Sequence, residues 1–215
     1  MRKGLICIIG IDGAGKTTHA LKLLSSLRKS TRCKYAWLRS AYFFSFPFMF
    51  VCRMLGFVRL HNLSNKNKRV EHQYYRNKPI ALLWPWVQLM DILVLITFRV
   101  YVLNCLSFVI CDRYIHDILV DVMVDIDDEQ LYKKLIGRLM LNLMPRSATV
   151  VMLDVDETTA LKRKDDIPNL EYVSARRKLY HTIATYLKIP VVDGRQKFSS
   201  VNENILERVK ISLLV

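Results

Sequence analysis

The residues from Gly10 to Thr17 match the pattern G-x-x-x-x-G-K-[ST], whose residue types suit the binding of a phosphate chain. An apolar run at 5–9 predicts a buried strand before the motif, and spaced apolar residues after it predict an amphipathic helix. In this context the glycines allow successive backbone N–H groups to point into one concavity at the positive end of the helix dipole. We expect the loop to bind ATP through Gly10, Ile11, Asp12, Gly13, Ala14, Gly15, Lys16, Thr17 and Thr18.

Two side chains of this motif add their own chemistry to that of the backbone. Lys16 is expected to reach the β and γ phosphates of the nucleotide, where its positive charge would be catalytic. Thr17 supplies a hydroxyl that could ligate Mg²⁺, with waters and phosphate oxygens completing the octahedron. The alternative is a glycine-rich turn that binds nothing, but it does not account for the Lys-Thr pair. The motif therefore predicts a site for ATP with Mg²⁺ as cofactor.

The elements that must position this loop are predicted from the alternation of apolar runs along the chain. Strands are expected at 5–9, 35–38, 107–111, 148–154 and 189–193, with helices between them. This alternation predicts a five-stranded parallel sheet with right-handed crossovers and helices on both faces. With the phosphate-binding motif, it indicates an α/β fold of the three-layer P-loop NTPase class. A length of 215 residues suits one domain, 1–215.

Composition narrows the partners and the compartment. The net charge of +14 favours polyanions, which include nucleotides, nucleic acids and anionic membranes. No stacking-plus-basic motif of an RNA or DNA module is present, so no specific nucleic-acid partner is expected. The five cysteines lack C-x-x-C spacing, and two of them fall in predicted central strands. We expect reduced thiols, no leader peptide before the first strand, and a cytoplasmic location.

Two apolar segments complicate this interpretation. Residues 41–58, in an apolar insertion at about 41–60, are predicted to form a helix pair against the core, and the basic stretch 61–78 a loop followed by a short helix. The alternative for 41–58 is a surface that meets a membrane or another subunit. Residues 80–110 are predicted to form a buried helix and a core strand, because polar residues near the middle disfavour a membrane span. A homodimer is therefore one possible assembly, and peripheral membrane contact is the less favoured alternative.

Charged residues follow several predicted strands, where a parallel sheet places its ligand-binding groups. Asp12, Arg39, Asp112 with Arg113, and the basic run 162–164 would share one edge of the sheet and could converge on the bound phosphates. Phosphoryl transfer needs such positioned cations, together with Mg²⁺ and closing segments that exclude water. Farther along, the row Asp117, Asp121 and Asp125 is interpreted as a solvated helix face, and His116 as a structural residue.

These motifs resemble those of the thymidylate kinase family of P-loop nucleoside monophosphate kinases. The resemblance rests on residues 10–18, on Asp-Arg-Tyr at 112–114, and on 153–157 leading into 160–164, and it covers most of the chain except 40–80. It implies that Asp12 is catalytic beside the acceptor and that Asp112 joins Thr17 as a Mg²⁺ ligand. It also implies that the acceptor binds to Arg39, Gln88, Asp91, Arg113 and Tyr114.

The family also requires an arginine at the transferring phosphate. The position used within the loop by some members is Gly13 here, so the resemblance implies a lid at about 160–170 with Arg163 as its catalytic cation, flanked by two lysines. The family's aromatic residue and arginine for reading thymine have no clear equivalents here; Gln88 and Asp91 lie near their places.

The expected reaction is the ATP-dependent phosphorylation of a nucleoside monophosphate, dTMP to dTDP. One alternative is a P-loop kinase for another small acceptor, and the other is an ATP-binding switch associated with a membrane or a protein.

Overall fold

The computed structural model describes residues 4–38, 43–62, 68–101, 103–104 and 107–214. Its centre is a five-stranded sheet with the order β2-β5-β1-β6-β7, in which every pair of neighbouring strands is parallel. The strands are β1 (Leu5–Ile9), β2 (Cys33–Trp37), β5 (Phe108–Asp112), β6 (Thr149–Asp154) and β7 (Val191–Asp193). The predicted α/β architecture with a five-stranded parallel sheet is therefore confirmed.

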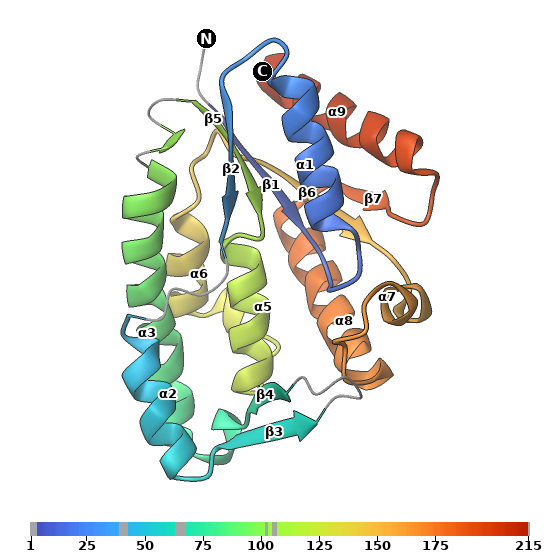
Figure 1. Ribbon diagram of the computed structural model, residues 1–215. Coiled ribbons are helices and arrows are strands. Elements are labelled where there is room, and N and C mark those ends of the chain that lie inside the picture. The colour runs from blue at the N-terminus through green and yellow to red at the C-terminus, as the bar shows by residue number, and fades with distance from the viewer. Residues whose placement is uncertain (1–3, 39–42, 63–67, 102, 105–106, 215) are drawn as a thin grey trace.

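The apolar strands lie at the middle of the sheet because both of its faces are covered. Every residue of β1 and of β5 is buried, as expected for strands with helices on either side. The helices α1 (Lys16–Leu27) and α9 (Phe198–Leu214) lie together on one side, and α5 (Ile115–Asp125) and α8 (Leu170–Leu187) on the other (Figure 1). This arrangement is consistent with a three-layer α/β fold.

The register of the strands brings their carboxyl ends to one edge of the sheet. Asp112 at the end of β5 lies opposite Ile8 of β1 and Trp37 of β2, and Ile9 lies opposite Met152 of β6. The carboxyl ends of four strands are therefore level at one edge, where the loop to α1 begins. Cys7 and Cys111 are also opposite each other and fully buried, in agreement with the prediction of core thiols.

Two further helices follow helix α5 and strand β6. Helix α6 (Leu135–Asn142) comes after a short 3₁₀ turn at Leu131–Lys133 and packs on α3 and α5. Helix α7 (Glu157–Arg163) begins where Asp156 accepts a hydrogen bond from the backbone N–H of Thr159, an N-cap that the sequence offers just after β6.

The segment between β2 and β5 departs from the sequence prediction. One helix, α2 (Ser45–Met54), replaces the predicted helix pair, and its outer side is exposed rather than packed. The predicted loop at 61–78 is wrong, because β3 (Val58–Asn62) and β4 (Lys68–His72) form an antiparallel hairpin, whereas the short helix predicted after it is present as a 3₁₀ turn. Apolar Val58 and Leu60 alternate with polar residues in β3, but β4 has the single apolar residue Val70, and the high charge of the segment obscured this weak signal.

A 3₁₀ turn at Tyr74–Arg76 then leads into the long helix α3 (Lys78–Leu95), which continues as a π-helical turn at Ile96–Tyr101. Asn77 caps the start of α3 by accepting a hydrogen bond from the backbone N–H of Ile80. In Figure 1, α3 stands beside α2 and α6 at the edge of the molecule. Its inner side buries Trp84, Leu89 and Ile92 in the core.

Candidate functional site

The loop between β1 and α1 has the backbone that the motif predicts. Gly10 and Gly13 have φ angles of 140° and 84°, in the region that favours glycine. A Cβ at Gly10 would lie 2.3 Å from the carbonyl oxygen of Leu153, and one at Gly13 would lie 2.6 Å from that of Ala160. The loop is thus pressed against the end of β6 and against α7, and only glycine fits at either position.

Lys16 begins α1 and folds back over this loop. Its ammonium donates hydrogen bonds to the carbonyl oxygens of Gly10, at 2.6 Å, and of Ile11, at 2.9 Å. Burial, together with the nearby charge of Arg113, lowers the pKa of Lys16 to about 8. The loop therefore holds a buried, positively charged group at its centre, where an added anion would raise that pKa again.

A second polar group joins Thr17 to the end of β5. The Thr17 hydroxyl donates to Oδ2 of Asp112, and the hydroxyl of Tyr35 donates to the same oxygen at 2.9 Å. The other oxygen, Oδ1 of Asp112, is buried and has no hydrogen-bond partner in the described structure. An unpartnered buried carboxylate oxygen beside a hydroxyl fits a hard cation such as Mg²⁺. Among the described residues, no group of three or more His, Cys, Asp or Glu side chains forms a metal site.

Arg113 and Asp12 form an ion pair across the edge of the sheet. An Nη of Arg113 donates to Oδ1 of Asp12, and the ammonium of Lys164 lies 3.6 Å from that oxygen. Burial alone would lower the pKa of Arg113, but the carboxylates of Asp12 and Asp117 raise it above its usual value, so the guanidinium stays charged. Three charged groups, one from the loop, one from the residue after β5 and one from the residue after α7, thus meet beside the loop between β1 and α1.

The lid residues are placed differently from the family pattern. Arg163 donates to the backbone carbonyl of Gly194 at 3.2 Å, so the structure directs it toward the turn after β7. Lys164, one residue later, is the member of the 162–164 run that reaches Asp12. It also lies 3.2 Å from Asp166. Within the 162–164 run, the side chain that contacts the loop between β1 and α1 is therefore that of Lys164. The catalytic role of Arg163 stays a prediction.

Ion pairs that were not predicted from the sequence join the end of β6 and the start of α7 to α8. Arg177 on α8 makes a bidentate ion pair with Asp154, both contacts being 2.8 Å, and also contacts Glu157 at 3.2 Å. His181 lies 3.1 Å from the same aspartate. Burial would raise the pKa of Asp154, but its hydrogen bonds with Arg177 outweigh that and lower it. The sequence does contain a signal for this network. Two arginines at 176–177 lie in a predicted helix that comes after the acidic residues Asp154 and Asp156, and arginine pairs well with carboxylates.

The start of α5 holds Arg113 in place. Asp117 accepts a hydrogen bond from the backbone N–H of Tyr114 at 2.9 Å and another from the Tyr180 hydroxyl at 2.6 Å. Arg113, with φ 69°, adopts a left-handed conformation that this fastening must maintain. The predicted solvated face is therefore wrong for two of the three aspartates. Asp117 is buried, and Asp125 is buried and accepts a hydrogen bond from the Trp84 indole N–H at 3.0 Å.

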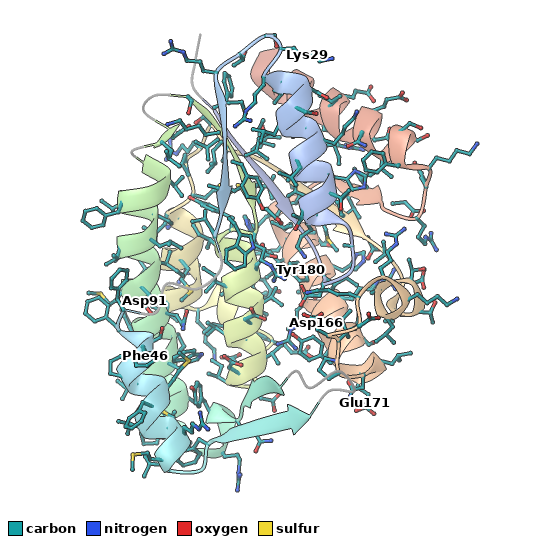
Figure 2. The ribbon with its side chains drawn as sticks, viewed as in Figure 1. Lys29, Phe46, Asp91, Asp166, Glu171 and Tyr180 are labelled. Atoms are coloured by element: carbon teal, nitrogen blue, oxygen red, sulfur yellow. The ribbon has the colours of Figure 1, made fainter. Side chains whose placement is uncertain are left out.

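The other predicted acceptor residues lie in varied places. Tyr114 is fully buried, and its hydroxyl has no hydrogen-bond partner within the described chain. Gln88 is buried on the inner side of α3. Both carboxylate oxygens of Asp91 accept backbone hydrogen bonds at the start of α2, from Phe44 at 2.7 Å and from Ser45 at 3.0 Å. Figure 2 labels Asp91 there, where it holds α2 on α3. Arg39 lies outside the described residues.

His116 is buried in the core one helical turn away from the ion pair. Neither ring nitrogen has a hydrogen-bond partner in the described structure, and burial lowers the pKa of the imidazole to about 4. A neutral, enclosed imidazole agrees with its interpretation as a structural residue.

Compared with known proteins, the chain matches no family model and no curated sequence. The geometry of the loop and its neighbours therefore carries the functional argument.

Proposed function

We propose that this protein is a P-loop kinase that transfers the γ-phosphoryl group of ATP to a nucleoside monophosphate, most simply dTMP. The observation that carries the proposal is the meeting of three groups at one edge of the sheet. These are the Lys16 ammonium inside the glycine loop, the Thr17–Asp112 pair, and the Arg113–Asp12 ion pair. Each matches one requirement of phosphoryl transfer: a donor cradle, a site for the metal, and a cation for the acceptor phosphate.

In the proposed reaction, an oxygen of the acceptor phosphate attacks the γ phosphorus as the bond to the β–γ bridging oxygen breaks, and ADP leaves. The protein's part is to position and stabilise, since such transition states need little covalent chemistry. Lys16 would leave the carbonyl oxygens of Gly10 and Ile11 for the β and γ phosphates. Mg²⁺, when bound near Thr17 and Asp112, would neutralise charge on those phosphates.

Arg113 is proposed to orient the acceptor phosphate, while Asp12 keeps the guanidinium charged and aimed. Closure of the segment that carries Lys164 would bring a further cation to the transferring group and exclude water. The proposal of a nucleotide acceptor, and of dTMP in particular, draws on the resemblance of residues 10–18, 112–114 and 153–164 to thymidylate kinases. A kinase for another small phosphorylated acceptor would use the same donor groups.

The test is ADP production by purified protein with ATP, Mg²⁺ and each nucleoside monophosphate in turn. We expect turnover with dTMP, and a loss of at least about a hundredfold in Lys16→Ala, as when a preorganised electrostatic group is removed. Lys22→Ala is the matched control, because Lys22 lies on the same helix, α1, but is exposed. ADP production that no acceptor stimulates would overturn the kinase assignment, and turnover with another monophosphate alone would replace dTMP.

A further inference from the structure

The outer side of α2 is apolar and open to solvent. Phe46, Phe50 and Met54, spaced four residues apart on one side of the helix, have exposed fractions of 65%, 60% and 76%. The opposite side of the helix is packed, with Ser45 and Cys52 buried. Figure 2 labels Phe46 at the start of α2. A soluble helix ordinarily shows polar residues on such an outer side, so its reversal calls for an apolar partner.

Helix α3 continues the same surface. Leu82, Trp86 and Met90 form a second exposed stripe with four-residue spacing. Within the described structure, Lys78–Phe98 is the one helix long and apolar enough to cross a membrane. Its inner side is nonetheless fixed to the fold, since Trp84 donates to Asp125 and Asp91 accepts from the start of α2. These contacts hold the inner side of α3 in the fold, so its outer side is the part that is exposed for an apolar partner.

The two helices pack on each other, and we call the exposed apolar side chains of 43–57 and 80–98 the apolar face. Phe48 of α2 stacks on Trp84 of α3 with ring centroids 5.5 Å apart, and the Asp91 hydrogen bonds join the helices at the other end. Thirteen of the twenty-one large apolar side chains that are exposed in the described structure lie in these two segments, so the face is a concentration and not a scatter.

Charge at the edges of this face has one sign. Arg53 on α2 and Arg76 and Lys78 at the start of α3 are exposed, whereas Asp91 is buried and occupied by α2. Between residues 43 and 101, the acidic residues of the sequence are Glu71 and Asp91, and the basic ones are Arg53, Arg59, Lys66, Lys68, Arg69, Arg76, Lys78 and Arg99. Among the described residues, Arg53, Arg76 and Lys78 thus form a basic border to the apolar face, which complements a surface of anionic headgroups over hydrocarbon.

We propose that the apolar face docks this protein on an anionic lipid bilayer. The aromatic and aliphatic side chains would enter the boundary between headgroups and acyl chains, and the basic border would meet the phosphates. A second copy of the chain would also cover apolar groups, but it would bring like charges together, and each chain carries a net charge of +14. In Figure 1, helices α2 and α3 lie on the opposite side of α5 from the loop between β1 and α1, so docking through these helices leaves the proposed kinase site open.

The test is flotation of the full chain with vesicles of phosphatidylcholine alone and with phosphatidylserine added. We expect binding to the anionic vesicles that weakens as salt is raised. Phe46→Ser with Phe50→Ser should reduce it at least tenfold. Leu82→Ser and Leu21→Ser form a matched pair, since both leucines are exposed but only Leu82 lies on the apolar face. Leu21→Ser should bind like the unmodified protein, and thermal unfolding of each variant checks that the fold is kept.

Failure to float with either kind of vesicle would overturn the proposal. So would sedimentation as a dimer that the Phe46→Ser/Phe50→Ser variant converts to a monomer, because the apolar face would then belong to a second copy. Binding that is equal with and without phosphatidylserine would remove the charge argument and overturn the anionic specificity.

Discussion

In and beside the loop between β1 and α1, charged groups are largely buried and each contacts a partner of opposite charge or a backbone carbonyl, whereas on the apolar face large hydrocarbon side chains are exposed. Lys16 and Asp12 are buried, and Arg113, which pairs with Asp12, is mostly buried. Phe46 and Met54, only some forty residues along the chain, are mostly open to solvent. Both regions depart from the usual rule of apolar residues inside and charged residues outside. The comparison teaches that each departure from this rule indicates a candidate binding surface, for an anion in the first region and for an apolar partner in the second.

The largest effect is expected from glycine substitutions that compare the two regions. Gly13 and Gly56 both have positive φ, at 84° and 78°, but a Cβ at Gly13 meets the backbone of Ala160 while one at Gly56 meets nothing within 4 Å. Gly13→Ala should abolish nucleotide binding and lower the free energy of unfolding by about 2–4 kcal/mol, because strain and overlap add. Gly56→Ala should cost about 1 kcal/mol and leave binding intact. Calorimetry and urea unfolding measure both.

Asp91→Asn is expected to have the next largest effect. The carboxylate accepts the backbone N–H groups of Phe44 and Ser45, and an amide can replace only one of its two oxygens. We expect a loss of about 1–3 kcal/mol in the free energy of unfolding, measured with urea, because a buried hydrogen bond is removed. Unchanged stability together with a raised acceptor KM would instead support the role that the family resemblance implies for Asp91.

A smaller effect is expected from pH, through Lys16. Its pKa of about 8 in the folded protein would rise when phosphates bind, so binding takes up a proton above pH 8. The affinity for a non-hydrolysable ATP analogue should therefore fall about tenfold between pH 7 and pH 9. Lys16→Arg keeps its charge throughout this range and should show a much flatter profile. Parallel profiles for the two proteins would mean that another group titrates.

The smallest effect separates two neighbouring residues at the end of α7. Lys164 lies 3.6 Å from Asp12, while Arg163 donates to Gly194. Lys164→Ala should lower kcat more than Arg163→Ala, by roughly tenfold, if the nearer cation stabilises the transferring group. The opposite order would assign the lid role to Arg163, as the family resemblance implies, and would require α7 to turn its end toward the loop on closure.

The sheet and the loop could be predicted because local signals and tertiary context agree there. The strand at 5–9 is apolar throughout and completely buried, and the spacing from Gly10 to Thr17 specifies a backbone that the structure contains. Helix α8 begins directly after Asn169, a typical N-cap residue that accepts a hydrogen bond from the backbone N–H of Tyr172. In these places each residue type is compatible with only one environment.

The segment between β2 and β5 could not be predicted in the same way. An apolar run such as 43–55 looks alike whether it faces the core or a partner, so the sequence could not indicate that α2 is exposed. Asp117 and Asp125 have a spacing typical of a solvated helix face, but Tyr180 and Trp84, distant in the chain, donate hydrogen bonds to them. Only the assembled fold supplies such partners.

The buried thiols can report which part of the fold opens first. Cys7 and Cys111 are shut inside the sheet, and Cys52 is enclosed on the inner side of α2. Burial also raises the pKa of Cys7 and of Cys52, which keeps their sulfurs protonated and unreactive. A thiol reagent can therefore label each one only when its own region opens. If α2 peels away before the sheet separates, Cys52 will react first, and the difference in labelling rate will report how much less cooperative that part of the fold is.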